Sequence, residues 1–359
     1  MNLEEYARSL VERSITPGLA ILAGRYGKIF FQNQWGYRSL VPERETLPER
    51  TLFDCASLTK PLITAFLAAY LSQRRQLDLA DPVSRFFPSL PSDITLRHLL
   101  THTAALPAWY PFYLYGSDSL AQFPHLPRNG RPGKRELYSC PGYILLRHII
   151  EKASGFPLPA LAGEAIFSRL QLTDTFLRVP SDRRLEAAAT EKGNRWEKQL
   201  CRKNHQRAAR DFPWRESVIR GETHDANSFY SGGCAGNSGL FSTASDLFVL
   251  AREFFPSTTS TFTPETLRVF WARATLGKRS PRTIGFKLNC AWQTSGGAAL
   301  AAEAIGHNGF TGTSIWLEGE TASVFIILSN RIHPLVKTFN FDRVRRRLHR
   351  LIKRELGWR

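Results

Sequence analysis

Segments with the character of β-strands lie near both ends of this 359-residue chain, and the part between them shows mainly helical periodicity. β-branched and aromatic residues are concentrated in 18–24, 28–36, 284–294, 311–319 and 321–329. Arg25-Tyr26-Gly27 and Glu318-Gly319-Glu320 have the composition of hairpin turns. Because strands need partners, we expect the two ends to pair into one antiparallel sheet. The expected fold is therefore α+β, an α/β sandwich in which helices flank the sheet and a mainly helical insertion separates its two halves.

Apolar residues at helical spacing predict several helices. These are the residues before Pro17, a helix ending near Arg74, residues 96–103, 142–155 and 158–170, and a helix near the C-terminus. A proline is tolerated in a helix only near its first turn, so Pro61 requires that its helix begin close to Ser57. Residues 191–220 are polar and basic, and we predict a surface loop there.

The composition excludes several classes of protein. With 43% hydrophobic and 22% charged residues, the chain is expected to be folded rather than disordered. Its longest near-apolar stretch, residues 62–71, has about half the length needed to span a bilayer, so no membrane span is expected. The N-terminus has no basic segment followed by an apolar one, and the five cysteines form no CxxC pair. We therefore expect reduced thiols in a cytoplasmic protein, with no metal site and no cofactor.

The net charge of +17 is concentrated in the C-terminal segment NFDRVRRRLHRLIKREL. Such a charge would attract nucleic acid or an anionic membrane. The same segment has apolar residues at helical spacing, which predicts an amphipathic helix with one face on the core and a solvated basic face. We favour this second interpretation, so no nucleic-acid partner is expected.

Ser57-Leu58-Thr59-Lys60 is an S-x-x-K motif at the start of the apolar helix. Three residues apart on a helix, the hydroxyl and the amine lie on the same face. This arrangement suits a serine nucleophile whose proton passes to a lysine, provided that burial lowers the lysine pKa. About one such tetrapeptide is expected by chance in a chain of this length. The evidence for a nucleophile is therefore its position at a helix N-terminus, where the dipole and free N–H groups favour an oxyanion.

Two further segments contain groups that such a nucleophile would need. Tyr138, just before the predicted helix 142–155, offers a phenol that could relay protons. The glycine-rich segment 306–312 precedes a predicted strand and would let a substrate approach the backbone closely.

Together these segments resemble the serine β-lactamase and penicillin-binding-protein superfamily, in particular the class C β-lactamase-like branch that includes D-alanyl-D-alanine peptidases and carboxylesterases. The resemblance covers nearly the whole chain. Its segments are FDCASLTKPL, ITLRHLLTHTAALP, YSCPGYILLRHIIEKASG, GETHDANS, GNSGLFSTASDL, GHNGFTGTSIWL and LSNRIHP. It implies a single catalytic unit over 1–359, with a sheet region of 1–56 plus 260–359 and a helical region of 57–259.

The resemblance also implies roles for individual residues. Ser57 matches the nucleophile that forms the acyl-enzyme, Lys60 the lysine that activates it, and Tyr138 the tyrosine that assists proton transfer to the leaving group. His307-Asn308-Gly309 matches the K-T-G segment, and the backbone N–H groups of Ser57 and Phe310 would form the oxyanion hole. Whether the base is Lys60 alone or the Lys60–Tyr138 pair stays open.

The chain departs from the family pattern at two positions. Cys140 stands where an asparagine amide contacts the substrate, and His307 stands where a lysine attracts the substrate carboxylate. We expect His307 to be only partly charged near neutral pH. Both changes favour an esterase-like hydrolase of small acyl substrates over a β-lactamase or D-amino-acid peptidase. A non-catalytic binding or scaffold protein of the same fold is the third alternative, and the oligomeric state stays open.

Other chemistry-bearing residues have simpler explanations. His98 and His102 lack the intervening glutamate of a zinc-protease helix, so we expect capping and core roles. His224-Asp225 is expected to be structural rather than a second catalytic dyad, and Cys55 a buried small apolar group. Loop residues near 105–125 include Trp109, which predicts an apolar, aromatic mouth to the site.

Overall fold

The computed structural model describes residues 1–116, 118–275, 281–290 and 293–358. Its centre is a seven-stranded sheet in which all neighbouring strands are antiparallel. In spatial order the strands are β3 (Glu45–Thr46), β2 (Lys28–Ser39), β1 (Gly18–Arg25), β9 (Ser323–Ser329), β8 (Ser314–Glu318), β7 (Ile305–Asn308) and β6 (Lys287–Leu288). The expected α+β class and the sheet built from both ends of the chain are confirmed.

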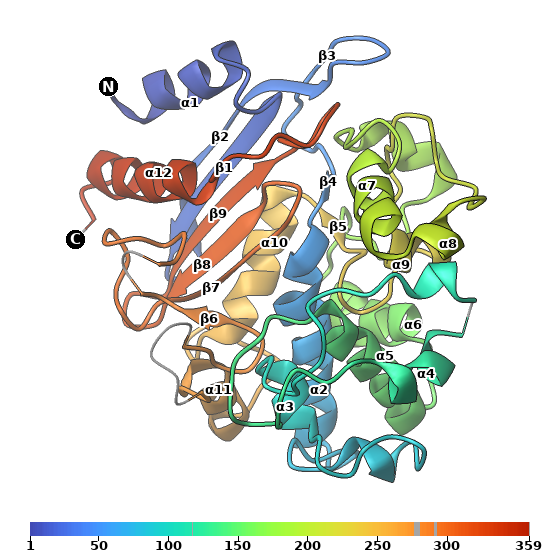
Figure 1. Ribbon diagram of the computed structural model, residues 1–359. Coiled ribbons are helices and arrows are strands. Elements are labelled where there is room, and N and C mark those ends of the chain that lie inside the picture. Colours follow the sequence, from blue (N-terminus) through green and yellow to red (C-terminus); the bar gives the residue numbers. More distant parts are fainter. Residues whose placement is uncertain (117, 276–280, 291–292, 359) are drawn as a thin grey trace.

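The two predicted hairpins form as expected. Tyr26 and Gly27 both have positive φ values, of 49° and 75°, which is the backbone twist that a tight hairpin between β1 and β2 requires. Strand β1 also pairs along its length with β9, so that Leu19 lies opposite Ser329. This central pair joins the N-terminal and C-terminal halves of the sheet (Figure 1).

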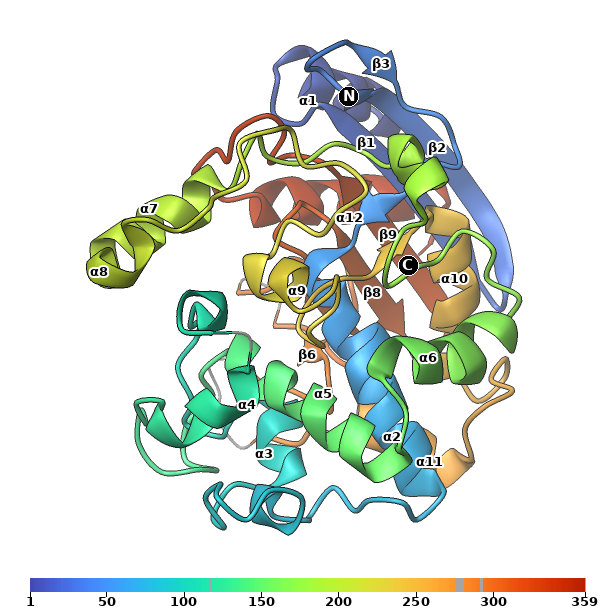
Figure 2. The same ribbon diagram turned by 90° about the vertical axis from the view of Figure 1, so that its right-hand side faces the viewer.

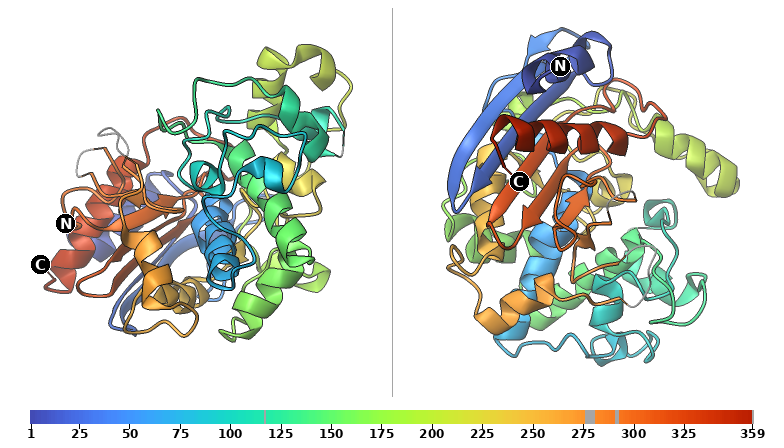
Figure 3. Two further views of the ribbon diagram at one scale, coloured as in Figure 1. Left: turned by 90° about the horizontal axis from the view of Figure 1, so that it is seen from below. Right: turned by 90° about the vertical axis from the view of Figure 1, so that its left-hand side faces the viewer.

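Helices cover both faces of the sheet. Helices α1 (Leu3–Glu12) and α12 (Asp342–Glu355) pack on one face against side chains such as Ile21 and Phe325, and Figure 3 shows α12 lying across the strands. On the other face, α10 (Ala244–Ala251) and α2 (Phe66–Gln73) belong to the main hydrophobic core. In β1, Ala20 and Leu22 point to this main core, as the alternation of side chains along a strand requires.

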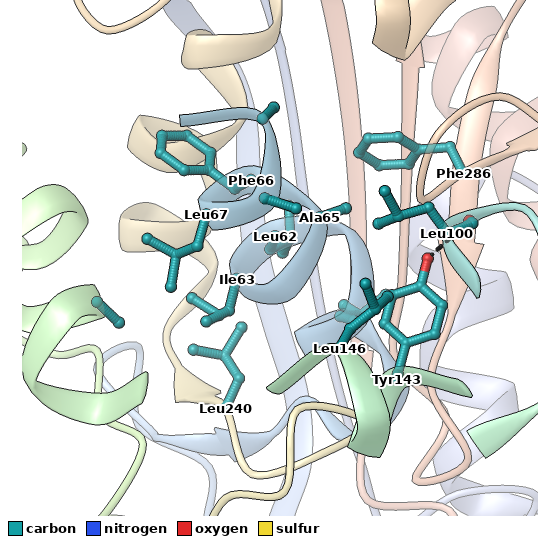
Figure 4. Packing of buried hydrophobic residues seen from close by; sticks show 14 of the residues in the cluster. Leu62, Ile63, Ala65, Phe66, Leu67, Leu100, Tyr143, Leu146, Leu240 and Phe286 are labelled. Carbon is teal, nitrogen blue, oxygen red and sulfur yellow. Dashed lines mark hydrogen bonds between the residues drawn. The ribbon is translucent and has the colours of Figure 1, made fainter. Parts of the chain in front are cut away.

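The remaining helices lie mostly on the side of α2 away from the sheet (Figure 2). They are α3 (Leu96–Leu100), α4 (Ser119–Gln122), α5 (Cys140–Ser154), α6 (Leu158–Ala162), α7 (Arg195–Asn204), α8 (Gln206–Ala209), α9 (Ala226–Tyr230) and α11 (Pro264–Trp271). A second, two-stranded sheet pairs β4 (Phe53–Asp54), just before the S-x-x-K segment, with β5 (Phe241–Ser242). Figure 4 shows side chains of α5 and of the Ser57 helix meeting in the core, where the Tyr143 hydroxyl donates to the Leu100 carbonyl at 2.9 Å.

Two predicted segments differ from the structure. The predicted strand 284–294 is reduced to Lys287–Leu288, and residues 291–292 lie outside the described residues. The predicted surface loop 191–220 contains α7 and α8, and Glu197 and Cys201 on α7 are buried. The cause is that α7 buries polar side chains, which a search for apolar periodicity does not detect.

The basic C-terminal helix is amphipathic, as predicted, but its cations are not all solvated. Arg345 and Lys353 are buried, and each forms an ion pair, Arg345 with Asp342 and Lys353 with Glu318. Within the described residues, no helix is both long enough and apolar enough to cross a membrane.

Candidate active site

Ser57 lies in the first turn of its helix, as Pro61 predicts. A 3-10 turn over Ala56–Leu58 leads through a π-helical segment, Lys60–Ala65, into α2. Ala56 has a φ of 47°, a left-handed conformation that costs energy for a residue with a β-carbon. The Asp54 carboxylate holds this turn, because it accepts hydrogen bonds from the backbone N–H groups of Ala56 and His224, both at 2.8 Å. The tight turn leaves Ser57 half-buried at the wall of a cavity.

The Lys60 ammonium lies beside the Ser57 hydroxyl. Its Nζ donates to Ser57 Oγ at 3.0 Å and to the backbone carbonyl of Asn237 at 2.8 Å. A third neighbour is the Cys140 sulfur, at 3.6 Å. Lys60 is fully buried, so its charge is held by these three contacts rather than by solvent. The S-x-x-K geometry predicted from the spacing is present.

The pKa of Lys60 differs from the expectation. Burial acts to lower this pKa, but the nearby Cys140, Tyr138 and Asp225 outweigh burial and leave it above its ordinary value. Burial raises the pKa of Tyr138 as well, while the charge of Lys60 and hydrogen bonds with Lys60 and Ser57 act in the opposite direction. In the resting state at neutral pH, the site therefore holds an ammonium and a neutral phenol.

Tyr138 precedes α5 and faces the Lys60 side chain. Its ring centre lies 5.0 Å from Lys60 Nζ, 4.5 Å from the His102 ring and 5.9 Å from the His307 ring. The next residue, Ser139, fixes this position, because it caps α5, donates to the Pro107 carbonyl and receives its own hydrogen bond from neighbouring backbone. His102 contributes by accepting the Ser139 backbone N–H at 3.0 Å, which is the core role expected for it.

The segment after β7 is fastened to the turn that carries Ser57. The Thr311 hydroxyl donates to the Asp54 carbonyl at 2.6 Å, and the Thr313 hydroxyl to the Cys55 carbonyl at 3.1 Å. Arg345 of α12 donates to the carbonyls of Gly309 and Thr313 from the other side. The C-terminal helix thus supports the site.

Gly309 is needed for this close approach. A β-carbon at this position would lie 2.0 Å from Thr313 Oγ1 and 2.6 Å from the Cys55 carbonyl oxygen. We expect Gly309→Ala to lower the free energy of unfolding by about 1–3 kcal/mol and to impair activity, because the Ser57 turn must shift. Gly163→Ala is the matched control, since a β-carbon added there would meet no atom within 4 Å and the position is helical. Chemical denaturation of both variants measures the difference; equal stability of the two would contradict this account of Gly309.

Two residues of the cavity wall, Ser57 and Phe310, have backbone N–H groups that are available as donors. Within the described part of the chain, neither the Ser57 nor the Phe310 amide donates a hydrogen bond to another protein group. Ser57 and Phe310 both line the cavity. Free amide donors beside a serine hydroxyl are what a tetrahedral oxyanion requires.

His307 and Gly309, by contrast, do not line the cavity in the described structure. His307 is buried, and its Nδ1 lies 2.9 Å from the Asn308 carbonyl. Burial lowers its pKa well below the ordinary value, and the cations Lys60, Arg282 and Lys287 add to this effect. The expectation of a partly charged His307 is therefore wrong: the imidazole is neutral at neutral pH, because burial and three nearby cations disfavour a further charge.

The cavity at Ser57 has a volume of about 270 Å³. Its walls are formed by Ala56, Ser57, Trp109, Tyr138, Cys140, Trp196, Glu197, Leu200, His224, Asp225, Ser238 and Phe310. Of the loop residues predicted to form an aromatic mouth, Trp109 lines the cavity, and Cys140 is also part of the wall. Burial raises the pKa of the Cys140 thiol, so this group is neutral.

Sequence reasoning missed the wall that α7 provides. Trp196, Glu197 and Leu200 come from the segment predicted to be a surface loop. The spacing of Asn194 and Glu197 is that of a helix N-terminus, and this signal was available in the sequence. Recognising it would have predicted a helix here, though not its place at the cavity.

His224 is structural, as expected, but its partner is not Asp225. Its Nε2 lies 2.9 Å from Glu191 Oε2, and its ring stacks on Phe310 with centroids 5.5 Å apart. Burial acts to lower the pKa of His224, while the bond to Glu191 and the nearby Glu197 outweigh it and leave the pKa raised. The pair therefore carries opposite charges, and it fixes the Phe310 side of the cavity.

Among the residues that the structure describes, no group of three or more His, Cys, Asp or Glu side chains could hold a metal ion, and all five cysteines are free.

The model of the beta-lactamase family matches residues 3–348 of the chain. The chain belongs to the beta-lactamase family.

Individual relatives within and around this family differ in activity. A protein of Escherichia coli (strain K12) described as a putative D-alanyl-D-alanine carboxypeptidase is 28% identical, over 89% of this chain and 80% of the relative. A class C beta-lactamase has a similar structure, with a TM-score of 0.76 and 16% identity over 99% of this chain and 95% of that chain. EstCE1, described as a hydrolase with promiscuous acyltransferase activity, has a TM-score of 0.72 and 19% identity over 97% of both chains. The protein is thus a serine hydrolase of the beta-lactamase fold, and the substrate has to be argued from the site.

Proposed function

We propose that the protein forms an acyl-enzyme at Ser57 and hydrolyses small carboxylic esters. The observation that carries this proposal is the fully buried Lys60 ammonium, 3.0 Å from a serine hydroxyl that opens into a cavity. Lysine side chains are rarely fully buried, so a buried ammonium beside a serine hydroxyl at a cavity favours a chemical role. Tyr138 completes a proton-transfer pair next to the same hydroxyl.

In this mechanism, the Lys60–Tyr138 pair first releases one proton to solvent. Ser57 Oγ then forms a bond to the acyl carbon while its own proton passes to the pair. The amides of Ser57 and Phe310 stabilise the oxyanion, and the pair then returns the proton to the alkoxide, which leaves as an alcohol. Water adds to the acyl carbon in the second half, the bond to Ser57 Oγ breaks, and the carboxylic acid is released with the serine proton restored.

The neutral His307 favours an ester over a β-lactam or a D-alanyl peptide. A substrate that carries a carboxylate needs a cation in the cavity, and among the described lining residues only His224 carries a positive charge, which Glu191 already neutralises. The E. coli relative is described as a putative D-alanyl-D-alanine carboxypeptidase, so a D-amino-acid peptidase is the second candidate function. Turnover of nitrocefin, or a stable adduct with a labelled penicillin, would favour that candidate.

A fluorophosphonate probe tests the proposed function. It should label the intact protein at Ser57, as located by mass mapping, and purified protein should hydrolyse short-chain p-nitrophenyl esters. A chain of the same fold that acts only as a scaffold has no need of an activated serine. Absence of both labelling and hydrolysis would support the scaffold alternative and refute the proposal.

The free cysteines support a second, smaller proposal. All five are unpaired, including Cys201 and Cys234 in the interior. We therefore propose that the protein works in a reducing compartment such as the cytoplasm.

The raised pKa of Lys60 predicts how activity depends on pH. Because the lysine is protonated at neutral pH, the form able to accept the Ser57 proton becomes more abundant as pH rises. We expect kcat/KM for a p-nitrophenyl ester to increase between about pH 6 and 9, after subtraction of the uncatalysed rate.

The same profile measured on Tyr138→Phe distinguishes the two candidates for the base. If Lys60 alone is the base, the variant keeps the rise with pH at a lower rate. If the coupled pair is the base, the rise is lost with the phenol. A wild-type profile that falls over this range would contradict the assignment of Lys60 as an ammonium in the resting site.

A further inference from the structure

Four exposed arginines form a row along α12. The members of this arginine row are Arg343, Arg347, Arg350 and Arg354. With 100° and 1.5 Å per residue, a helix places these four positions within an arc of about 60° along a line of about 16 Å. Leu348 and Ile352 hold the opposite face of α12 on the sheet, and Figure 3 shows the helix on the outside of the molecule. The arginine row therefore faces outward as one straight line of positive charge.

Among the described residues, no carboxylate forms an ion pair with the arginine row. The ion pairs of α12 use its buried cations instead, Arg345 with Asp342 and Lys353 with Glu318. The exposed Glu355 lies about 100° around the helix from the preceding arginine, outside the row.

The acidic side chains of the neighbouring helix α1 already have partners. Glu4 forms an ion pair with Arg8, and Glu5 accepts the Asn2 backbone N–H at 2.9 Å as part of the helix cap. The positive charge of the arginine row is thus available to an anionic partner outside the chain.

Exposed apolar side chains border the arginine row at two places. Met1 is 62% exposed, and it accepts hydrogen bonds from Arg347 at its sulfur and from Arg354 at its backbone carbonyl. Phe30 is 54% exposed and packs edge-on against Trp358, with ring centroids 5.6 Å apart. The Trp358 backbone N–H donates to a carbonyl in the last turn of α12 at 2.8 Å, so this aromatic pair lies at the end of the helix. Cations bordered by apolar side chains are typical of surfaces that lie in the headgroup layer of an anionic bilayer.

The apolar border favours a bilayer over nucleic acid. The phosphates of either partner would attract the arginine row. A nucleic-acid duplex presents only phosphates and sugars along its backbone, whereas Met1 and Phe30 could enter the boundary between headgroups and acyl chains of a bilayer. Helices α7 and α8 also carry exposed cations, but the chain leaves helical geometry between them at His205, with a φ of −137°, so those cations do not form one straight row.

We propose that α12 docks the protein on the surface of a bilayer rich in anionic phospholipid, with the arginine row on the headgroups and with Met1 and Phe30 inserted at its edge. The apolar face of α12 stays on the core, so the helix lies on the bilayer without entering it. Helix α2, which follows Ser57, packs on the opposite face of the sheet, so docking leaves the catalytic side of the molecule in the aqueous phase. The cytoplasmic leaflet contains such lipids, in agreement with the reducing compartment proposed from the free cysteines.

Flotation of the full chain with lipid vesicles tests the inference. Phosphatidylcholine vesicles with about 30% phosphatidylserine should bind the protein, and vesicles of phosphatidylcholine alone should not. Raising the salt from about 0.1 to about 0.5 M should weaken binding at least ~10-fold, because salt screens the exposed charges. Each arginine near an anionic surface raises the partition coefficient about fivefold, so glutamine at all four positions of the row should reduce it at least ~50-fold.

Two further variants separate the charge of the row from its effect on folding and from net charge. Lysine at all four positions keeps the charge and should retain binding within about threefold. The second variant removes four exposed cations of α7 and α8 and combines Arg202→Gln, Lys203→Gln, Arg207→Gln and Arg210→Gln. It should weaken binding by less than about threefold, because these charges lie away from the docked face. Circular dichroism checks the fold of each variant.

Phe30→Gln tests the apolar border. We expect it to lower the partition coefficient about threefold to tenfold and to leave any binding to duplex DNA unchanged. Phe156→Gln is the matched control, because Phe156 is 53% exposed and lies between α5 and α6, away from α12. Its partition coefficient should equal that of the wild type.

Several outcomes would overturn the inference. They are equal binding to neutral and anionic vesicles, full binding by the glutamine variant of the arginine row, and a greater loss in the α7–α8 variant than in that variant. Tighter binding to duplex DNA than to anionic vesicles would assign the row to nucleic acid instead. Ester hydrolysis and Ser57 labelling, measured on the same preparations without vesicles, report separately on the proposed function.

Discussion

Replacement of Ser57 by alanine is expected to reduce ester hydrolysis by about 10³–10⁶-fold, to the rate that the oxyanion-binding amides and substrate positioning alone provide. The serine is half-buried and its hydroxyl bonds to groups of the site, including Lys60, so its removal should leave the fold in place. Steady-state kinetics on p-nitrophenyl acetate, with circular dichroism as the folding control, measures the effect. Ser238→Ala is the matched control, because Ser238 lines the same cavity and, among the described residues, its hydroxyl bonds to Thr223 and not to Lys60.

Equal rates for wild type and Ser57→Ala would refute the acyl-enzyme mechanism. A loss of the same size in Ser238→Ala would show that the cavity responds to any serine removal, and the assignment of the nucleophile would then lack support. The expected pattern is a large loss in the first variant and a loss of less than about tenfold in the second.

Replacement of Lys60 by methionine should separate activity from stability. Methionine has nearly the same length, fits the same apolar surroundings and carries no charge. We expect kcat/KM to fall by about 10³-fold or more, since the serine proton then has no acceptor beyond Tyr138. The free energy of unfolding should fall by no more than about 2 kcal/mol, because methionine keeps the packing and only the buried hydrogen bond to the Asn237 carbonyl is lost.

Urea denaturation and ester kinetics on the same preparation of Lys60→Met test both parts of this expectation. A variant that is both inactive and strongly destabilised would show that the lysine holds the fold through its hydrogen bond to the Asn237 carbonyl. In that case, activity loss would not identify the base. A variant with near-normal activity would exclude Lys60 from the chemistry.

The sequence was most informative where one residue restricts the backbone locally. Pro61 places a helix start at Ser57, and the structure has a helical turn beginning at Ala56. The composition and turns of the terminal segments were likewise enough to predict the main hairpin and the sheet that joins both ends. The helix start and the hairpin depend on local geometry, and the joining of the two ends follows because strands need partners.

The electrostatics of the site could not be predicted in the same way. Lys60 and Cys140 are 80 residues apart in the chain, and their contact depends on how the helix after Ser57 packs against α5. Whether His307 is charged depends on Arg282 and Lys287, which tertiary packing brings beside it. A pKa is set by burial and by neighbours in space, so the spacing of residues in the sequence does not determine it.

Helix α7 could not be predicted from the sequence for a different reason. Its buried positions include Glu197 and Cys201, and its exposed positions are strongly basic, so hydropathy indicates a solvated loop. A helix that buries a carboxylate against a tyrosine hydroxyl looks polar in the sequence. Its place at the cavity follows from tertiary contacts, including that of Glu197 with the Tyr113 hydroxyl.

The pairing of β1 with β9 has a consequence for the order of events during synthesis. Strand β1 is synthesised long before its partner β9 and before the Arg345 side chain that supports the Gly309 segment. The contacts that hold the Ser57 turn against the sheet therefore cannot form until α12 has been synthesised. A nascent chain that ends before α12 would carry the serine, the lysine and the tyrosine without the framework that aligns them, so hydrolytic activity should appear only after α12 has left the ribosome.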